Sequence, residues 1–353
     1  MSKAAEAREI SAGTAQQEPP LCSVCIANYN GMAVIDACIA SVRSQDCNFA
    51  FEILVHDDAS TDGSADYIRQ RHPDVRLIAG EDNVGFCIAN NRMVQAAGGT
   101  FLLLLNNDAE LFPDALRTLH EAASQDTKPA MLSLPQYDAQ SGALIDIGCR
   151  FDPFLNAIPR LHATDGATAA ISGACMWMPR SLWDELGGFP DWFGSLAEDS
   201  LLCCLARLYG YRVEALGTSG FRHWVGQSLG GGKIVDRRLR TAATRRAKSE
   251  RNKNYVMALT YPGPMLAAIL PIHALLLLCE GATLALIKRD RSIFTSIYLA
   301  SLAALWQRRR QLAQERKAIQ ARRRIDTRQF CAAFDKMPHK LSLLLRFGWP
   351  EIR

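Results

Sequence analysis

Three polar residues that could serve chemistry follow one short apolar run. Residues 101–108, FLLLLNND, place Asn106, Asn107 and Asp108 directly after five apolar side chains. A run of this length is typical of a strand buried on both faces, as in a parallel sheet. Ligands of open α/β sheets bind outside the carboxyl ends of the strands, where one carboxylate and two amides would serve a ligand. The same residue types also favour turns, and this stretch alone does not decide between the two.

Two further predicted strands also end in polar residues. LCSVCIANYN, from Leu21, predicts a strand with a polar turn, and FEILVHDDAS predicts one that ends at Asp57 and Asp58. Three polar strand ends at equivalent positions indicate a binding edge. The strands alternate with helix-like stretches, which predicts βαβ units and a parallel sheet. The expected helices cover 31–45, 60–72 with Ser60 or Thr61 as N-cap, and 85–99, and a further strand covers 75–80.

A second acidic pair lies in the less regular middle of the chain, residues 113–211. We expect a strand over 174–178 and a helix that begins near Glu198 and ends at Gly210. Glu198 and Asp199 then lie in the first helical turn, where acidic residues favour the helix dipole, and that effect alone could account for them. FRHWVGQSLGGGK, residues 221–233, predicts a loop that contains His223.

The charge of the chain is unevenly distributed. Its 353 residues are 48% hydrophobic and 22% charged, which fits one large domain with an appendage, or two domains. The formal net charge is +4, but most acidic groups precede residue 220, and the stretch after Lys233 is rich in Lys and Arg. This asymmetry predicts a C-terminal part that faces an anionic partner, either phospholipid or nucleic acid.

The cysteines and the first residues predict a cytoplasmic location. Most of the eleven cysteines lie in apolar runs, which favours buried thiols in a reducing compartment. Cys22 and Cys25 form a Cys-x-x-Cys pair without a second pair at zinc spacing, so we expect no metal or redox role for them. Residues 1–20 lack an apolar segment, and we expect a disordered leader rather than a signal peptide.

An apolar stretch from Pro264 to Ile287 is long enough to span a bilayer. Three features argue against a single span: His273 and Glu280 share one helical face, Pro271 would kink the helix, and both flanks are basic. A helical hairpin or an in-plane amphipathic pair would place both basic flanks on anionic lipid at the cytoplasmic face. A buried helical subdomain is the alternative. Nucleic acid is not expected as a partner, because the basic tail has apolar neighbours rather than interleaved aromatic residues.

An ordered set of segments resembles family 2 glycosyltransferases with the GT-A fold. The segments are SVCIANYN, VHDDASTDGS, NVGF, LLNNDAEL, SGACMWMPR, GGFPDWF with EDSLLC, and HWVGQS. The resemblance covers roughly residues 21–235, and the branch is the one of bacterial rhamnosyltransferase-like proteins. It implies an α/β protein with a Rossmann-like, mostly parallel central sheet flanked by helices. The apolar and basic residues that follow predict a helical region that associates with a membrane.

The resemblance implies a nucleotide-sugar donor, linked to dTDP, UDP or GDP. Asp57 and Asp58 match the nucleotide-binding acid pair of the family, and their alternative roles are those of turn and N-cap residues. Asp82, Asn83 and Gly85 match the segment beside the nucleotide, where glycine allows close backbone approach. The nucleotide-binding residues expected in this chain are Asn28, Asp57, Asp58, Asn83, Gly85 and Asn107.

The residues after the apolar run match the Asp-x-Asp motif of the family, which holds Mg²⁺ or Mn²⁺ against the two phosphates. The chain departs from that motif, because Asn106 replaces the first carboxylate and would retain the metal less strongly. The implied ligands are Asp108 first, Asn106 in support, and His223, which matches a histidine that completes the metal shell in some relatives. A loop histidine without a metal is the alternative for His223.

Glu198 and Asp199 match the Glu-Asp motif of the family, whose aspartate is the usual general base in inverting transfer. One base without a second nucleophile suits a single displacement at the anomeric carbon. We therefore expect Asp199 to be the base, with Glu198 orienting the acceptor or raising the pKa of the base. A well-placed base contributes roughly 10²- to 10⁴-fold in rate.

Together these features predict three segments and one activity. A leader (1–20) precedes a GT-A domain (21–235) and a helical, apolar and basic membrane-associating region (236–353). We expect an inverting glycosyltransferase at the cytoplasmic face of the inner membrane, peripheral or anchored by a hairpin, that acts on a glycan or lipid-linked glycan acceptor. The alternative is a catalytically silent nucleotide-sugar-binding scaffold, which the asparagine at position 106 favours.

Overall fold

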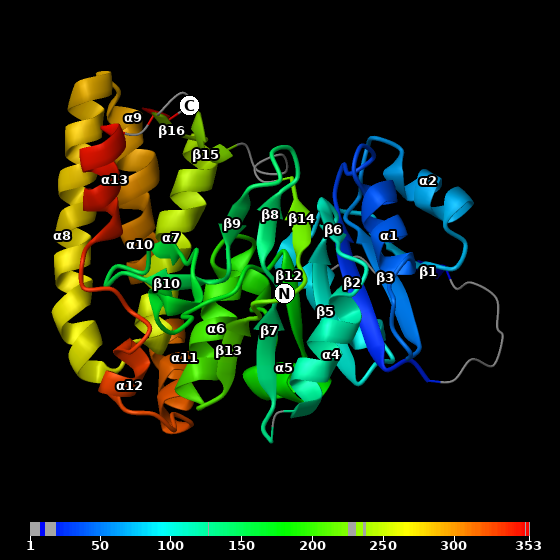
Figure 1. Ribbon diagram of the computed structural model, residues 1–353. Coiled ribbons are helices and arrows are strands. Elements are labelled where there is room, and N and C mark those ends of the chain that lie inside the picture. The colour runs from blue at the N-terminus through cyan, green and yellow to red at the C-terminus, as the bar shows by residue number, and fades with distance from the viewer. Residues whose placement is uncertain are drawn as a thin grey trace.

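The fold centres on an eight-stranded sheet in the order β1-β4-β3-β2-β5-β12-β7-β13 (Figure 1). The computed structural model describes residues 8–10, 19–125, 127–224, 231–235, 238–349 and 351–352. Strands β4, β3, β2 and β5 run parallel, β12 is antiparallel to β5 and β7, and β13 is parallel to β7. The strands are β1 (Arg8–Ile10), β2 (Cys22–Asn28), β3 (Phe51–Asp57), β4 (Arg76–Ala79), β5 (Phe101–Asn106), β7 (Ala130–Ser133), β12 (Cys175–Pro179) and β13 (Arg212–Ala215).

Helices cover both faces of this sheet because β5 is apolar on both sides. Leu103 and Leu105 face one core, which α1 (Ile35–Arg43), α2 (Ser64–Arg71) and α4 (Ala115–Gln125) close. Leu102 and Leu104 face the other core, together with α3 (Phe86–Ala96), α5 (Arg180–Leu186) and α6 (Glu198–Leu208). The predicted doubly covered strand and the mostly parallel sheet are therefore confirmed. Cys22 and Cys25 are buried in β2, and all eleven cysteines are free thiols.

Two local predictions differ from the structure. The N-cap of α2 is Gly63 rather than Ser60 or Thr61, because the backbone N–H groups of those two residues donate to Asp57 and Asn30. The predicted loop at 221–233 contains strand β14 (Phe221–His223) and the start of β15 (Gly231–Val235), while residues 225–230 lie outside the described residues. Strand β14 pairs with β6 (Ala109–Leu111) and β8 (Gln136–Asp138), and β8 pairs with β9 (Leu144–Asp146).

The predicted disordered leader contains one short strand, β1, which pairs with β4 at the sheet edge. Residues 1–7 and 11–18 lie outside the described residues. The remaining short elements are β10 (Cys149–Phe151), β11 (Ala157–Pro159), η1 (Ala163–Asp165), η2 (Asp191–Phe193), β16 (Arg238–Thr241) and β17 (Glu351–Ile352).

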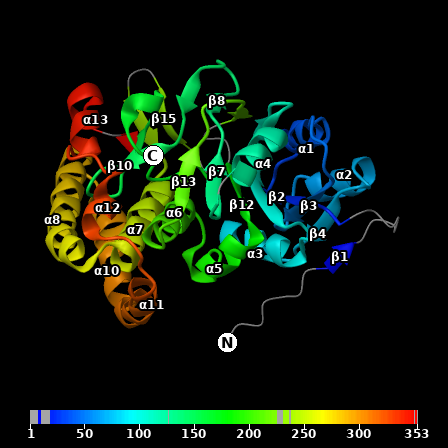
Figure 2. The ribbon, with the colours of Figure 1, turned by 60° about the horizontal axis from the view of Figure 1, so that its bottom comes forward.

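The C-terminal helices gather at one end of the sheet, as two views agree (Figures 1 and 2). They are α7 (Ala243–Thr260), α8 (Gly263–Lys288), α9 (Arg291–Ile293), η3 (Phe294–Leu299), α10 (Ala300–Gln307), α11 (Arg309–Ala321), α12 (Thr327–Cys331) and α13 (His339–Phe347). Tyr255 and Val256 of α7 belong to the same buried core as Leu201 and Leu202 of α6. Residues on the two sides of the predicted boundary at 235/236 therefore share one core.

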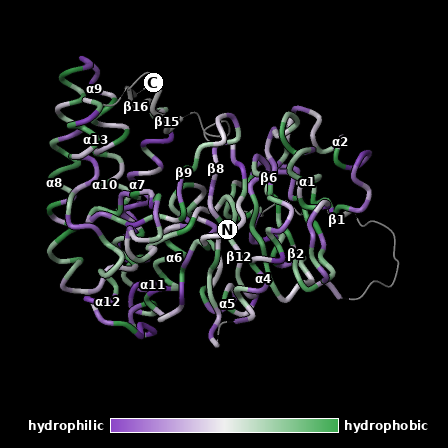
Figure 3. Tube along the Cα trace, in the orientation of Figure 1, coloured by the Kyte–Doolittle hydropathy of each residue, from purple (hydrophilic) through white to green (hydrophobic). Residues whose placement is uncertain are grey.

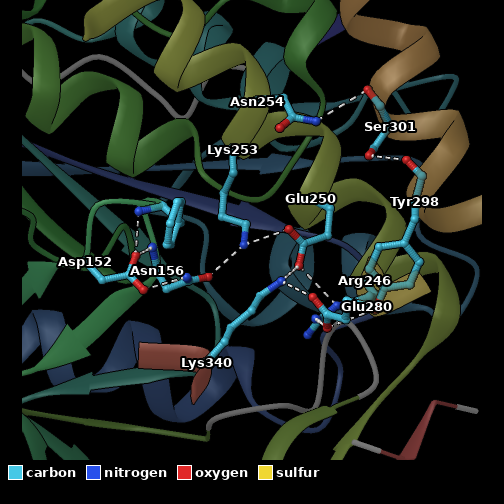
Figure 4. Close-up of polar contacts among 11 residues, drawn as sticks. Asp152, Asn156, Arg246, Glu250, Lys253, Asn254, Glu280, Tyr298, Ser301 and Lys340 are labelled. Carbon is cyan, nitrogen blue, oxygen red and sulfur yellow. Dashed lines mark hydrogen bonds and ion pairs between the residues drawn. The ribbon is translucent and has the colours of Figure 1, made fainter. Parts of the chain in front are cut away.

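His273 and Glu280 of α8 share one helical face, as the spacing predicted, and this face packs against protein. His273 is buried, and Glu280 accepts hydrogen bonds from Tyr298, Lys340 and Arg246. These contacts belong to a larger polar network, in which the fully buried Glu250 of α7 binds Arg246, Lys253 and Lys340 (Figure 4). Buried charges are costly unless they are paired, so this network fixes how α7, α8, η3 and α13 pack.

The opposite side of α8 is apolar and exposed. Among the described residues, one helix, Gly263–Lys288, is long and apolar enough to cross a membrane by length and composition. Much of α8 has the colour of hydrophobic residues in Figure 3. Leu275 is 61% exposed and Leu286 is 79% exposed. The exposed Lys288 and Arg289 follow at its C-terminal end.

Candidate active site

One half of the candidate site is a chain of side-chain hydrogen bonds across the ends of β2, β3 and β5. The Nδ2 group of Asn28 donates to Asp57 Oδ2 at 2.8 Å and to Ser64 Oγ at 3.0 Å. Its Oδ1 atom accepts from Asn107 Nδ2 at 2.8 Å. A Cβ atom at Gly31 would lie 2.1 Å from Asn28 Oδ1, so this packing requires glycine. Three of the predicted nucleotide-binding residues, Asn28, Asp57 and Asn107, thus bind one another.

Asp58 fixes the segment that was predicted to lie beside the nucleotide. Its two carboxylate oxygens accept from the backbone N–H groups of Val84 at 2.7 Å and Gly85 at 2.8 Å. Gly85 has a φ of +85°, a conformation that favours glycine, and it precedes the first residue of α3. Asn83 is exposed at the same turn. Asp58 therefore shapes the backbone around Asn83 and Gly85.

The three predicted metal ligands lie together. His223 Nε2 is 3.1 Å from Asp108 Oδ1 and 3.5 Å from Asn106 Nδ2, and Gln136 Nε2 lies 3.0 Å from His223 Nδ1. The second carboxylate oxygen of Asp108 is buried without a hydrogen-bond partner. A carboxylate oxygen and an amide carbonyl oxygen suit Mg²⁺ or Mn²⁺, and the imidazole, a softer ligand, makes Mn²⁺ the better match of the two. Within the described residues no three His, Cys, Asp or Glu side chains converge, so Asn106 is needed to complete a set of three.

The acidic pair lies at the start of α6, and its two members differ in environment. Glu198 is buried, and its Oε2 atom has no hydrogen-bond partner. Asp199 is half-buried and accepts from the backbone N–H groups of Gly173 at 3.2 Å and Ser200 at 2.6 Å. These N–H groups satisfy the carboxylate of Asp199 and hold that side chain in one geometry.

The pKa values of the two acids follow from that difference. Burial, and then the charge of Asp199, raise the pKa of Glu198 to about 8, against an opposing effect of Arg245. Burial also raises the pKa of Asp199, while the N–H groups of Gly173 and Ser200 act in the opposite direction. The charge of Asp199 thus acts on the pKa of Glu198, while burial and backbone N–H groups are the main influences on the pKa of Asp199.

Two hydrogen bonds connect the metal-ligand cluster to the acidic pair. Strand β5 pairs with β12, and the N–H group of Asn106 donates to Ala174 O at 3.0 Å. The next residue back along the chain, Gly173, donates to Asp199. Both clusters thus lie at the same end of the β5–β12 pair.

Sequence reasoning missed the residues that hold these clusters. Gln136 orients His223 from a neighbouring strand, and no local pattern marks it. Gly31 follows Asn-Tyr-Asn directly, so its position next to a predicted strand end was a usable signal of close packing. Gly173 lies in the SGACMWMPR segment that carried the resemblance, but its contact with Asp199 spans 26 positions.

Comparison with known structures defines the class of fold. A mannosyltransferase from Pyrobaculum calidifontis, solved in complex with GDP-Man and Mn²⁺, aligns with a TM-score of 0.51 and 20% identity over 82% of this chain and 87% of that one. The structure of GalNAc-T7 with UDP, GalNAc and Mn²⁺ aligns with a TM-score of 0.53 and 16% identity over 71% of this chain and 49% of that one. The fold is GT-A, as predicted.

Sequence comparison defines the family. Residues 23–187 match the model of the family described as Glycosyl transferase family 2, so this part of the chain is a family 2 glycosyltransferase domain. An N-acetylglucosaminyl-diphospho-decaprenol L-rhamnosyltransferase of Mycobacterium tuberculosis (strain H37Rv) is 26% identical over 177 residues, which cover 42% of this chain and 58% of the relative. The uncharacterized glycosyltransferase YibD of Escherichia coli (strain K12) is 34% identical over 107 residues, 30% of each chain. The matches thus span from about a third to somewhat over half of these relatives.

Proposed function

We propose that the protein is an inverting, metal-dependent glycosyltransferase that moves a sugar from a nucleotide-sugar donor to a lipid-linked glycan acceptor. The observation that carries the proposal is the short connection between Asn106 of the metal-ligand cluster and Asp199 of the acidic pair through Ala174 and Gly173. A transferase needs a group that binds the departing diphosphate and a base that accepts the proton of the acceptor hydroxyl, and both must lie in one cleft.

Asp199 is the proposed general base. Burial raises the pKa of Glu198 to about 8, which favours the neutral form of this side chain. The N–H groups of Gly173 and Ser200 act in the opposite direction on the pKa of Asp199 and favour its charged form. The backbone N–H groups of Gly173 and Ser200 orient the carboxylate of Asp199 toward one direction of attack. The acceptor oxygen forms a bond to the anomeric carbon as the bond to the diphosphate breaks, and its proton passes to Asp199.

Asp108, Asn106 and His223 are the proposed holders of Mg²⁺ or Mn²⁺. When bound there, the cation would supply Lewis-acid neutralisation of the charge on the diphosphate. Gln136 fixes the imidazole of His223, and Asp108 contributes a buried oxygen without another partner. On the other side of the site, Asp58 holds the turn at Gly85 against which the nucleotide is proposed to bind.

The acceptor class rests on the C-terminal helices. The exposed apolar side of α8, with Leu275 and Leu286, ends next to the exposed Lys288 and Arg289, and this combination suits the surface of an anionic bilayer. The mycobacterial relative is named for transfer to a diphospho-decaprenol carrier. We therefore propose that the protein binds the cytoplasmic face of the membrane, as a peripheral or hairpin-anchored protein, where a lipid-linked acceptor would be presented.

A turnover assay with a donor panel tests the activity. The purified full chain is mixed with dTDP-, UDP- and GDP-linked sugars, Mg²⁺ or Mn²⁺, and a lipid extract from the source cells. We expect transfer from one donor class, lost when a chelator removes the cation. Absence of both transfer and donor hydrolysis across the panel would overturn the proposal.

Vesicle sedimentation tests the membrane face. Replacing Leu275 and Leu286 by serine removes two exposed apolar side chains, each of which contributes roughly 1.5–3 kcal/mol if it is buried in lipid. We expect weaker binding to anionic vesicles, while Leu161→Ser, an exposed leucine of the glycosyltransferase domain, changes nothing. Stronger binding of the chain to single-stranded DNA than to vesicles, at the same moderate salt, would contradict the assignment.

The asparagine at position 106 favours a second candidate function, that of a scaffold that binds the donor but does not catalyse transfer. An amide carries no charge, so the metal cluster has a single carboxylate. Calorimetry separates the two functions: donor binding that is indifferent to Mg²⁺ and Mn²⁺, in a protein without turnover, would support the scaffold.

A further inference from the structure

Helix α7 reaches from the C-terminal region to the loop that leads into the acidic pair. We call residues 193–197 the entry loop, because α6 and its acids begin directly after it. Asn252 of α7 is fully buried, and its Nδ2 group lies 3.2 Å from Phe193 O, 3.0 Å from Ser195 O and 2.7 Å from Leu196 O. One side chain thus contacts three of the five carbonyl groups of the entry loop.

The neighbouring residue sets the orientation of this amide. Arg251 Nε donates to Asn252 Oδ1 at 2.9 Å, which directs the NH₂ group of Asn252 toward the entry loop. Arg251 also donates to Phe193 O at 3.2 Å. The direction of the amide therefore follows from its hydrogen-bond partners on both sides.

The entry loop needs external support because its backbone is unusual. Leu196 and Ala197 are not glycines, yet they have φ values of +75° and +66°, and Gly194 has +84°. Non-glycine residues persist in this conformation only where the surroundings hold them. The N-cap position of α6, Ala197, has no side-chain hydrogen bond to offer. Asn252 supplies contacts that the loop sequence lacks.

The entry loop also contacts the donor side of the site, through Gly194. Gly194 O accepts from the backbone N–H group of Cys87 in α3 at 3.1 Å. Cys87 follows the Gly85 turn, which Asp58 holds. The entry loop is therefore fixed between the proposed nucleotide-binding turn and α7, and it directs the residues that come next, Glu198 and Asp199.

We propose that Asn252 is a positioning residue that sets the place of Asp199 by holding the entry loop. This inference rests on the proposed function, because it assigns a role toward the proposed base. It also gives α7, which lies in the predicted membrane-associating region, a part in the chemistry. A misplacement of about 1 Å at a reacting group can lower turnover by roughly 100-fold.

A buried asparagine of the same helix provides the matched control. Asn254 is also fully buried, two residues further on, but its Nδ2 group donates to Ser301 O of a different helix at 3.5 Å (Figure 4). Loss of either side chain should affect packing, whereas only Asn252 should affect the entry loop.

The test compares Asn252→Ala, Asn252→Asp and Asn254→Ala, each measured as turnover per donor-binding site. If Asn252 has only a structural role, its replacement lowers the number of donor-binding sites and leaves the turnover per site unchanged. For both Asn252 variants we expect kcat per site to fall about 10- to 100-fold, with the KM for the donor little changed. Hydration of Asp199 should lower its raised pKa, so the acidic limb of the kcat profile moves to lower pH. Asn254→Ala should keep the kcat per site and the pH profile of the wild type.

Hydrogen exchange supplies a readout that does not require activity. Two amides report on the entry loop, because the N–H groups of Cys87 and Leu201 donate to Gly194 O and Ala197 O. In the wild-type chain we expect both amides to be protected, and the Asn252 variants should lose that protection selectively. Rapid exchange of these two amides in the wild type would overturn the proposal even if no Asn252 variant folds. Equal kcat per site in Asn252→Asp and wild type would overturn it as well. If the wild type transfers no sugar from any donor, the proposed function fails. The role of Asn252 in holding the entry loop is then tested by hydrogen exchange alone.

Discussion

The two sides of the candidate site are supported in different ways. On the donor side, residues near the strand ends bind one another: Asn28 joins Asp57 to Asn107, and Asp58 holds the turn at Gly85. On the acidic side, Asp199 follows an unusual backbone that a distant helix supports through Asn252.

The two halves of the site are therefore held rigid by different contacts. Donor-side residues are packed and hydrogen-bonded before any ligand arrives, so a substitution there should affect folding and donor binding together. The acidic side depends on contacts between the sheet and the C-terminal helices, so a substitution there can affect turnover separately. Three substitutions test this difference between the two sides, in order of decreasing expected effect.

Asp58→Ala should affect the donor side most. It removes a buried carboxylate that accepts from Val84 and Gly85, and hydrogen bonds to charged groups contribute roughly 1.5–3 kcal/mol each. We expect the free energy of unfolding to fall by about 3–5 kcal/mol, and donor affinity to fall with it. Denaturant unfolding and calorimetry measure the two quantities.

Asp62→Ala is the control for that change, because Asp62 accepts hydrogen bonds from the backbone N–H groups of Met32 and Ser64 at an exposed position of the same edge. A smaller loss of stability and little loss of donor affinity are expected. If Asp58→Ala binds the donor as tightly as the wild type, the turn at Gly85 does not form part of the donor site.

Glu198→Gln should alter the pH dependence of stability. The folded pKa of Glu198, about 8, lies above its ordinary value of 4.5, so its contribution is fully present below pH 4.5 and is lost as the pH rises through 8. The loss amounts to at most about 1.4 kcal/mol per pH unit in that window. Glutamine stays neutral, so the variant should gain stability relative to the wild type from pH 5 to pH 8. Thermal unfolding across this range measures it, and parallel curves would contradict a raised pKa.

Asn106→Asp should have the smallest effect and strengthen the metal site. It adds a second carboxylate beside Asp108 and His223, and ligand charge tunes cation affinity. We expect the Mg²⁺ or Mn²⁺ concentration for half-maximal turnover to fall about tenfold, which corresponds to roughly 1.4 kcal/mol.

The matched variant is Asn107→Asp, next along the chain. Asn107 donates to Asn28, and a carboxylate there would lose that hydrogen bond without joining the metal cluster. We expect lower stability and no gain in metal affinity. Equal metal dependence of Asn106→Asp and the wild type would exclude Asn106 as a ligand.

The donor side could be predicted from the sequence because it depends on strands and polar strand ends that short segments reveal. Apolar runs marked β2, β3 and β5, and the carboxyl ends of parallel strands meet at one edge, which brings the polar residues Asn28, Asp57 and Asn107 together. What the sequence did not indicate is that Asn28, Asp57 and Asn107 satisfy one another.

The acidic side could be predicted only in part. The resemblance marked Glu198 and Asp199, but nothing in Leu196 and Ala197 indicates a positive φ, since neither is glycine. Asn252 lies in a stretch read only as a basic flank, and its contact with Leu196 spans 56 positions. Contacts of this length depend on how whole helices pack, which no short pattern encodes.

Asp199→Asn tests the central claim most directly, with donor affinity and sugar transfer measured on the same preparation. The amide keeps the size of the side chain but cannot accept the proton of the acceptor. We predict that transfer falls by at least about 100-fold while the dissociation constant of the donor stays within about twofold of wild type, because the hydrogen-bonded donor side is untouched. Retained transfer, or an equal loss of donor binding and transfer, would contradict the assignment of Asp199 as the base.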